Sequence, residues 1–364
     1  MSIGIQPYLP EHVPEVRRFN RRLCGKAFPF PETAVSEQMR PGGRISEERF
    51  LAIEDGVVRG GYLLKRQDFA VGGETLSIGY YHSALSEGIV DHKYVMVGVQ
   101  LLLHAAKREP LLYALGMGGL DRPLPRMLKA AGWTLGAVPF HFRVVHPGRF
   151  LRNIRPLRTT GARRLLLDAA ARTGLGWAGI TALQRVRSGG KAAPSATVEL
   201  VDGFDSWADD LWTRCRPCYP FIGVRDSATL GELYPGGGFL RMKIASCGTI
   251  VGWAIALDTQ MREDQYFGDL RVGSIVDCLA LPEHAFPVIT AARGVLEERG
   301  VDLIVSNQAH PRWASALRQA GCPEGPSNFI FGCSKMLMAK LRAAGCGTER
   351  LFLNRGDGDG PIHL

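Results

Sequence analysis

The stretches Met127–Trp133 (MLKAAGW) and Leu317–Cys322 (LRQAGC) look alike, because each ends a short amphipathic helix at a glycine. Gly132 and Gly321 stand where a left-handed residue usually follows a helix. Outward from both stretches, the chain repeats one order of elements: helix, hairpin, long strand, helix, buried strand, short helix and closing strand. Two similar units in the same order indicate an internal duplication.

The first half contains this order between residues 10 and 145. Asp55-Gly56 marks its hairpin, because glycine accepts the positive φ of a tight turn. The pattern predicts helices over Pro10–Leu23, Tyr94–Lys107 and Arg122–Ala131, and strands over Arg49–Glu54, Val57–Lys65, Glu74–Leu85, Leu111–Met117 and Gly136–Val145.

The second half repeats the order from residue 197 onward, with a turn at Cys247-Gly248-Thr249. The pattern predicts helices over Ser206–Cys215, Phe286–Arg299 and Pro311–Ala320, and strands over Thr197–Val201, Phe239–Ser246, Ile250–Asp258, Arg271–Leu281, Val301–Ser306 and, closing the unit, Asn328–Cys333.

The chain of 364 residues, 46% hydrophobic and 22% charged, is long enough for two domains that each bury a core. We expect an α/β (α+β) protein with mixed, mostly antiparallel sheets flanked by helices. The expected ranges are an N-terminal domain at 1–148, a basic helical connector at 149–195, a C-terminal domain at 196–340 and an irregular tail at 341–364.

The excess of positive charge lies in one segment. Residues 141–191 hold eleven Arg or Lys and one acid, Asp168, whereas the rest of the chain holds 33 basic and 34 acidic residues. A basic amphipathic segment with Leu and Trp is typical of one that lies on an anionic membrane, which makes residues 149–187 a candidate for that contact. A linker helix packed between two domains explains the same pattern. Nucleic-acid binding is a third interpretation, but no nucleic-acid module accompanies the charge.

Cysteine usage and hydropathy indicate a cytoplasmic protein, at most peripheral to the inner membrane. No signal-peptide pattern opens the sequence, and the apolar run Thr173–Leu183 is shorter than the roughly 20 residues of a membrane span. The eight cysteines are scattered, which favours reduced thiols. Cys215 and Cys218 have CxxC spacing, but no second ligand pair follows, so no metal is expected.

The order of elements resembles the fold of the Gcn5-related N-acetyltransferases (GNATs), over nearly the whole chain apart from the connector and tail. MLKAAGW and ALRQAGC are similar to the turn that ends the family's short helix, and Asn307 follows a buried strand as in that family. The resemblance implies an acyltransferase with acyl-CoA as its co-substrate. Tandem copies also resemble Fem-type aminoacyltransferases of peptidoglycan bridges and predicted acyltransferases of exopolysaccharide gene clusters.

Three functions are open at this point. The first is N- or O-acyl transfer from acetyl-CoA or a longer acyl-CoA to a small-molecule, glycan or lipid-linked acceptor, such as an amino sugar or an exopolysaccharide precursor. The second is Fem-type transfer from aminoacyl-tRNA, the one case in which a nucleic acid is the expected partner. The third is a non-catalytic tandem scaffold whose donor loops have degenerated.

The loop after each long strand departs from the family pattern. Members that use acetyl-CoA usually carry Gln/Arg-x-x-Gly-x-Gly/Ala there, and its N–H groups hold the pyrophosphate at a helix N-terminus. Ser86–Tyr94 (SEGIVDHKY) offers one glycine, and Pro282–Phe286 (PEHAF) offers none. The resemblance therefore favours a donor loop in the first half, with Leu85, Ser86, Gly88, His92 and Lys93 as candidate cofactor-binding residues. Asn307, at the strand end of the second half, is a further candidate that the resemblance implies.

Acyl transfer needs a base for the acceptor's proton and a donor for the thioester oxyanion. The resemblance places the base near a long strand, and the candidates are Tyr80, His82, Glu87 and Asp277. Tyr80 and His82 share one face of their strand. Asp277 lies in an otherwise apolar strand, where a charge is costly unless it is paired or functional. A hydrogen-bonded strand histidine is the structural alternative for His82.

Overall fold

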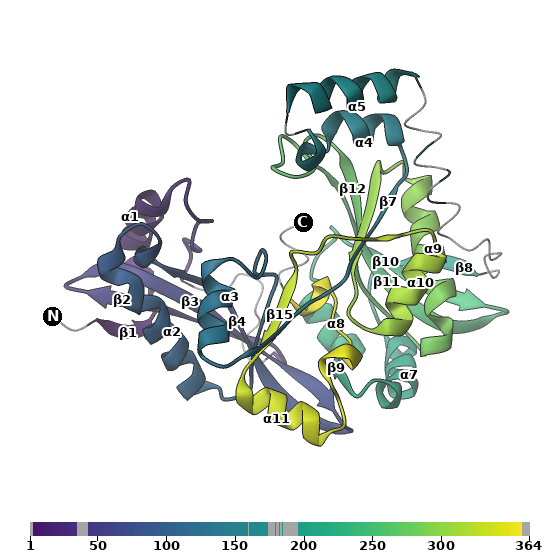
Figure 1. The fold of residues 1–364 in the computed structure, drawn as a ribbon. Helices are drawn as coiled ribbons and strands as arrows, with labels where there is room; N and C mark the ends of the chain where they lie inside the picture. Colours follow the sequence, from purple (N-terminus) through teal and green to yellow (C-terminus); the bar gives the residue numbers. More distant parts are fainter. Residues whose placement is uncertain are drawn as a thin grey trace. The chain divides into compact units, whose positions relative to one another are not determined.

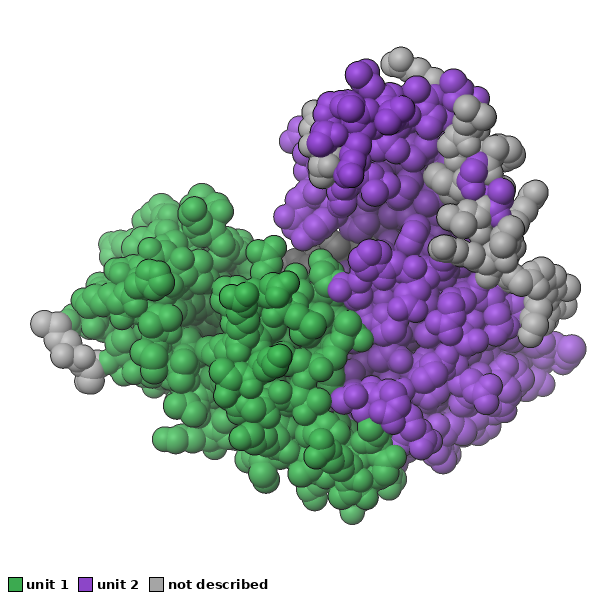
Figure 2. Space-filling view, viewed as in Figure 1, with its two compact units in different colours: residues 1–137, 328–347 green, residues 138–327, 348–364 purple. Residues whose placement is uncertain are grey.

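The structure is a computed structural model that describes residues 3–34, 43–158, 160–173, 179, 182, 184 and 196–358. It divides into two compact units, shown in Figure 2. Unit 1 comprises residues 1–137 and 328–347, and unit 2 comprises residues 138–327 and 348–364. Each unit combines one mixed sheet with flanking helices, which confirms the predicted fold class (Figure 1).

Unit 1 is built on a sheet of order β1-β2-β3-β4-β5-β15-β6. Its strands are β1 Gly4–Pro7, β2 Ser46–Glu54, β3 Val57–Val71, β4 Glu74–Ser86, β5 Leu112–Leu115, β6 Thr134–Ala137 and β15 Ile330–Cys333. Its helices are α1 Val13–Leu23, α2 Val95–Arg108, α3 Pro123–Ala130 and α11 Lys335–Ala343, with short 3₁₀ turns η1 Pro10–His12, η2 Glu87–Ile89 and η3 His92–Tyr94.

Local sequence explains the hairpin and helix ends of this unit. Asp55 and Gly56 adopt φ values of 49° and 76° between β2 and β3, as the turn signal predicts. Gly132 has φ 82° just after α3. Residues of β3, β4 and α2, among them Tyr62, Tyr81 and Leu101, form one buried cluster that holds α2 against the sheet.

Unit 2 is built on a sheet of order β14-β7-β13-β12-β11-β10-β8, with α9 and α10 packed beside it (Figure 1). The strands of this sheet are β7 Phe140–Val144, β8 Thr197–Val201, β10 Leu240–Ser246, β11 Thr249–Gln260, β12 Arg271–Ala280, β13 Leu303–Asn307 and β14 Glu324–Gly325. A further short strand within the residues of unit 2, β9 Phe221–Gly223, is not part of this sheet. Its helices are α4 Pro147–Asn153, α5 Gly161–Thr173, α7 Ser206–Cys215, α8 Ser227–Leu233, α9 Ala285–Glu298 and α10 Pro311–Gln319, with short turns η4 Arg155–Leu157, η5 Arg216–Cys218, η6 Pro282–His284, η7 Thr348–Arg350 and η8 Arg355–Asp357.

The two closing strands lie in the opposite sheets from those predicted. The segment Gly136–Val145 is split at Pro139, and its second part, β7, pairs with β13 of unit 2. β15 lies between β5 and β6 of unit 1. Both strands are only four or five residues long, so their alternation indicates a strand but does not identify its neighbours.

The start of the predicted connector is part of unit 2. Phe150, Leu151 and Ile154 are buried in a cluster with Leu270 and Val272, so α4 and the turn after it are anchored to the sheet. The predicted helix in the basic segment is present as α5. Most of residues 174–195, Trp177 and Ile180 included, fall outside the described residues. Among the helices that the structure describes, none has the length and apolar character needed to cross a membrane.

Candidate active site

The long strand of unit 1 leaves its parallel neighbour early. β4 pairs with β5 only at Gly79–Leu112 and Tyr80–Tyr113. Its register with β3 shifts just afterwards, at a bulge where Ser83 has φ 49°. Residues after Tyr80 therefore have no partner on β5, and the strand edge facing β5 is released from the ladder.

The long strand of unit 2 behaves in the same way. β12 pairs with β13 as far as Ile275–Ser306, and its register with β11 shifts at that point. His82 and Asp277 thus occupy corresponding positions, each two residues beyond the last parallel pair. The structure brings out an equivalence between these two candidates that the sequence alone did not show.

His82 lies in a cluster of polar and aromatic groups on unit 1. Its Nε2 is 3.6 Å from Oε2 of Glu47, and its side chain is 10% exposed. Its ring stacks on that of Tyr80, with centroids 4.5 Å apart and planes inclined by 4°. Its Nδ1 lies 3.3 Å from Oγ of Ser83. A carboxylate on one nitrogen of a histidine fixes the ring and stabilises its protonated form.

Glu47 is the residue of this cluster that the sequence analysis missed. It lies on β2, and Arg49 holds the same carboxylate at 2.8 Å. Burial pushes the pKa of Glu47 upward, but hydrogen bonding and the charges of His82 and Arg49 outweigh burial and bring the pKa below its ordinary value. The carboxylate therefore stays charged beside His82. The predicted strand began at Arg49, so no sequence signal joined Glu47 to a residue 35 positions later.

Tyr80 supports His82 from the same strand face, as alternation predicts. Its hydroxyl donates to the carbonyl of Leu115 at 3.1 Å, and its ring also stacks on Tyr113, with centroids 5.0 Å apart. The side chain is 1% exposed. Tyr80 thus forms a fixed aromatic wall beneath the imidazole.

Glu87, another candidate base, forms ion pairs with two arginines. Its two carboxylate oxygens accept from Arg22 at 2.7 Å and from Arg59 at 2.9 Å, and the residue is 5% exposed. Arg22 comes from α1 and Arg59 from β3, so Glu87 ties the loop after β4 to two other elements. This geometry favours a structural role for Glu87.

The loop after β4 satisfies most of its own N–H groups. Gly88 N–H donates to Oγ of Ser86 at 3.0 Å, and Lys93 N–H donates to Oδ1 of Asp91 at 3.0 Å. Carbonyls within the loop accept from the N–H groups of Val90, Asp91 and Tyr94. Gly88 is needed because a Cβ there would lie 2.7 Å from Cα of Val95.

The predicted binding residues of this loop fall into two groups. Leu85 is buried in the core, and Ser86 and Gly88 are engaged with each other. His92 and Lys93 are exposed at the start of α2 and retain side chains that suit an anion. A phosphate group fits this loop through those two exposed side chains.

Asp277 is the centre of a buried network in unit 2. One carboxylate oxygen accepts from Nε of Arg225 at 2.6 Å and from the hydroxyl of Tyr234 at 2.5 Å. The other accepts from Nδ2 of Asn354 at 2.6 Å and from the N–H of Cys278 at 2.8 Å. Asp277 is 0% exposed and holds four donors, which favours a structural role over that of a base.

The chain near residue 354 lies where β12 and β13 diverge. Ala309 N–H donates to the carbonyl of Leu353 at 2.9 Å, and Gln308 forms a β-bridge with Asn354. A Cβ at Gly356 would lie 2.0 Å from Oη of Tyr234. Asn307 is buried beside this segment, and its amide donates to the carbonyl of Pro139 at 3.4 Å. The space between the diverging strands of unit 2 is thus occupied by the protein's own segment around Asn354.

Comparison with solved structures places this architecture among known folds. No family model and no curated protein matches the sequence. The N-myristoyltransferase of Saccharomyces cerevisiae, solved with bound myristoyl-CoA, aligns with a TM-score of 0.53 over 92% of this chain and 82% of its own, at 9% identity. A GCN5-related N-acetyltransferase from Anabaena variabilis aligns with a TM-score of 0.50 over 91% of this chain and 72% of its own, at 9% identity.

The chain has a GNAT-type fold. Both units of this GNAT-type fold carry the diverging strand pair, but they differ in what lies beside it. Unit 1 places a histidine–carboxylate pair there, and unit 2 places the buried Asp277 network.

The CxxC cysteines of this GNAT-type fold lie at the end of α7. Burial raises the pKa of Cys215 to about 12, and it also raises the pKa of the more exposed Cys218. A raised thiol pKa opposes the thiolate form that redox and metal chemistry require. Within the part of the chain that the structure describes, no three His, Cys, Asp or Glu side chains gather as metal ligands would.

Proposed function

We propose that the chain is an acyltransferase that moves an acyl group from acyl-CoA to an amine or hydroxyl, and that unit 1 carries the chemistry. The observation behind this proposal is the placement of His82, which faces Glu47 at 3.6 Å and stacks on Tyr80, two residues beyond the last β4–β5 pair. The S. cerevisiae N-myristoyltransferase, which has the same type of fold, was solved with myristoyl-CoA bound, which supports an acyl-CoA donor here.

His82 is proposed as the general base. The acceptor's lone pair attacks the thioester carbonyl carbon while its proton passes to Nδ1 of His82, the nitrogen that does not face Glu47. The carbon–sulfur bond then breaks, and the thiolate of CoA leaves and takes up the proton that His82 accepted, which returns the imidazole to its neutral form. The charged Glu47 stabilises the imidazolium that forms, and released N–H groups of β4 polarise the carbonyl oxygen.

The donor's pyrophosphate is proposed to lie at the loop after β4. The exposed side chains of His92 and Lys93 are the groups that would bind it. Of the predicted cofactor-binding residues, this assignment retains His92 and Lys93. It gives Leu85, Ser86 and Gly88 the task of shaping the loop, and it leaves Asn307 in the buried ladder of unit 2.

The acceptor is proposed to be an amino sugar or a glycan or lipid-linked precursor of an envelope polysaccharide, handled at the cytoplasmic face of the inner membrane. The exposed basic residues of the segment 149–187 support contact with an anionic surface. Arg152 and Arg155 on that segment are exposed.

Titration with CoA compounds tests the proposed donor. Acetyl-CoA, a longer acyl-CoA or free CoA at about 100 times its Kd should raise the melting temperature of the chain by roughly 5–10 °C, because such a ligand adds about 2.7 kcal/mol to the folded state. The preferred acyl length is the one that gives the largest shift. Absence of any CoA effect, together with RNase-sensitive binding of nucleic acid, would favour the Fem-type function. Absence of both would favour a non-catalytic scaffold.

Glu47→Gln tests the partner of His82. We expect kcat for acyl transfer to fall roughly 10- to 100-fold, because a neutral amide no longer stabilises the imidazolium, whereas loss of the orienting carboxylate of a serine-protease triad costs about 10⁴-fold. The CoA-induced thermal shift should persist. Glu48→Gln is the matched control, since Glu48 is the next residue of β2 and pairs with Arg66 and Arg108. Equal kcat values for the two variants would contradict the role of Glu47.

A further inference from the structure

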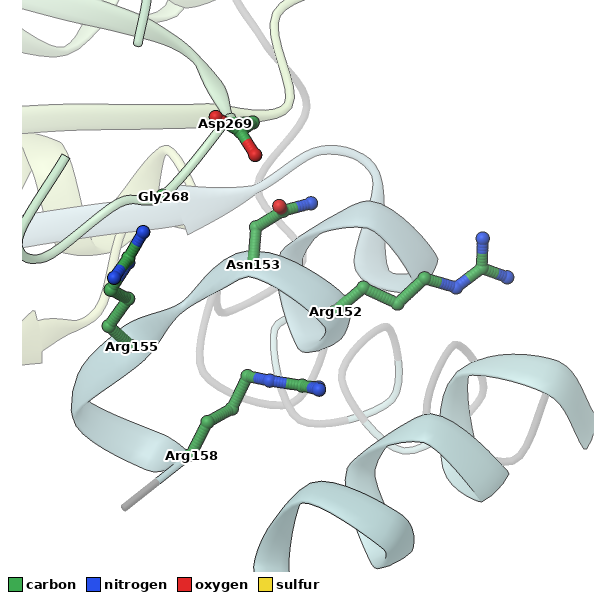
Figure 3. A pocket seen from close by; sticks show the side chains of 6 residues that line it. All are labelled: Arg152, Asn153, Arg155, Arg158, Gly268 and Asp269. Carbon is green, nitrogen blue, oxygen red and sulfur yellow. The ribbon is translucent and has the colours of Figure 1, made fainter. Parts of the chain in front are cut away.

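Unit 2 has a cavity that the proposed chemistry of unit 1 does not use. It has a volume of about 360 Å³ and is lined by Arg152, Asn153, Arg155, Arg158, Gly268 and Asp269. Figure 3 shows the side chains of Arg152 and Arg158 extending in the same direction from α4 and the turn after it, with Arg155 on the side of Gly268. Three arginines and one aspartate thus line the same hollow.

The backbone that carries these arginines is fixed. Phe150, Leu151 and Ile154 anchor it in the core of unit 2 between the arginines. The N–H of Arg155 donates to the carbonyl of Tyr266 at 3.0 Å. Gly268 has φ 60°, and a Cβ there would lie 2.7 Å from the carbonyl oxygen of Asn153, so the β11–β12 loop packs closely on the end of α4. The arginines therefore project from an ordered element.

The charges in the cavity favour an anion. Arg158 is paired with Asp168 at 2.7 Å, and Oδ1 of Asp269 accepts the N–H of Glu263 at 2.8 Å. Arg152 and Arg155 form no side-chain ion pair with any described residue, although both are exposed and line the cavity. A guanidinium matches a phosphate group because its N–H donors form a planar fork.

Exposed apolar side chains lie on the same short stretch of chain. Leu157, between Arg155 and Arg158, is 46% exposed, and Leu165 and Leu166 on α5 are 74% and 70% exposed. The opposite face of α5 is used for packing, because Leu167 packs against the cluster of α4. Arg152 and Arg155, together with these exposed leucines, are the combination that a membrane interface accommodates, with charge at the phosphates and leucine in the acyl boundary.

We infer that this cavity binds the phosphate group of an anionic phospholipid, with Leu157, Leu165 and Leu166 inserted beside it. The inference rests on the proposed membrane contact of residues 149–187 and gives that contact a defined binding site. It is independent of the acyl transfer proposed for unit 1, because none of the cavity residues belongs to that site.

Vesicle flotation of the full chain tests the site. The wild type should bind vesicles of phosphatidylcholine with phosphatidylglycerol and should not bind phosphatidylcholine alone. Arg152→Glu with Arg155→Glu should weaken binding at least about 30-fold, because each basic residue near an anionic surface contributes about 1 kcal/mol. Leu165→Ala with Leu166→Ala should weaken binding several-fold, and these exposed positions tolerate alanine.

Arg126→Glu with Lys129→Glu is the matched control, since it makes the same change of charge on exposed residues of α3. It should retain most of the vesicle binding. Equal loss in both charge variants would overturn the site in favour of a diffuse charge effect, and full binding by the Arg152/Arg155 variant would also overturn it. Inorganic pyrophosphate that stabilises only the wild type, without vesicle binding, would assign the cavity to a free phosphate compound instead. Release of CoA from a soluble donor, measured in parallel, should be unchanged in the cavity variants, so the two proposals fail separately.

Discussion

Replacing His82 by alanine should lower kcat/KM for acyl transfer by about 10²- to 10⁴-fold, the usual contribution of a general base. The expected cause is loss of the imidazole that takes the acceptor's proton. The surroundings should change little, because Glu47 and Arg49 remain paired without the imidazole. The thermal shift caused by CoA should remain, because the proposed donor loop lies after β4 and makes no use of the imidazole. Steady-state kinetics with CoA detection, together with the thermal shift, would measure both effects.

The pH dependence of the His82→Ala defect separates a base from a structural support. As the pH rises, hydroxide can take the proton that the acceptor loses during its attack, so the defect should shrink. His284→Ala is the matched control, because His284 belongs to the corresponding loop of unit 2 and should leave turnover near that of the wild type. A His82→Ala enzyme that keeps full turnover, or a His284→Ala enzyme that loses it, would contradict the assignment of the chemistry to unit 1.

Tyr80 gives a second control at the same site. Tyr80→Phe keeps the ring that stacks on His82 and loses the hydroxyl bound to the carbonyl of Leu115. If Tyr80 acts only as an aromatic wall, activity should change little.

The order of elements was predictable because it depends on local signals. The turn at Asp55-Gly56 and the glycines that follow the short helices have the positive φ values that their types favour. Gly321, for example, has φ 77° after α10. The exchange of β7 and β15 between the sheets was not predictable, because the partners of a short strand are set by contacts made across the whole chain.

The candidate site was predictable in part for the same reason. Alternation along one strand places Tyr80 and His82 on one face, and they stack. Glu47 comes from another strand, and nothing in the local pattern links it to His82. The apolar surroundings of Asp277 indicated a residue with a special partner, but Arg225 and Asn354 lie 52 and 77 positions away.

The buried network around Asp277 is expected to contribute strongly to the stability of unit 2, because it joins a buried guanidinium to two buried carboxylates. Asp277→Asn should lower the free energy of unfolding of unit 2 by about 3–5 kcal/mol, the usual cost of breaking a buried ion pair. The carboxylate of Asp277 accepts hydrogen bonds at both of its oxygens, whereas the amide of asparagine has only one oxygen. The NH₂ group of the amide would face one of the two donor pairs, either Arg225 and Tyr234 or Asn354 and Cys278. The guanidinium of Arg225, itself 0% exposed, would lose half of its compensating charge.

Asp357→Asn is the informative comparison, because Asp357 contacts the same arginine from η8. Burial, followed by the charge of Asp277, raises the pKa of Asp357 above its ordinary value, although Arg225 opposes the shift. A raised carboxyl pKa favours the folded state below the ordinary pKa, and that contribution is lost as the pH rises through the raised value. Asp357→Asn should therefore cost less, about 1–2 kcal/mol for the weakened hydrogen bonds, and should remove this part of the pH dependence.

Urea unfolding followed by tryptophan fluorescence measures both variants. Trp253 and Trp313 are fully buried in unit 2, so the fluorescence change reports its unfolding, and the transition must be assigned to this unit because a chain with two units need not unfold in one step. A loss of stability in Asp277→Asn that is no larger than in Asp357→Asn would show that the carboxylate of Asp277 is not the centre of the network. A stable Asp277→Asn protein that has lost acyl transfer would instead return Asp277 to the catalytic candidates. The expected result, a destabilised unit 2 with CoA binding retained below its transition, would separate the part of the chain that holds its fold through buried charge from the part proposed to perform chemistry.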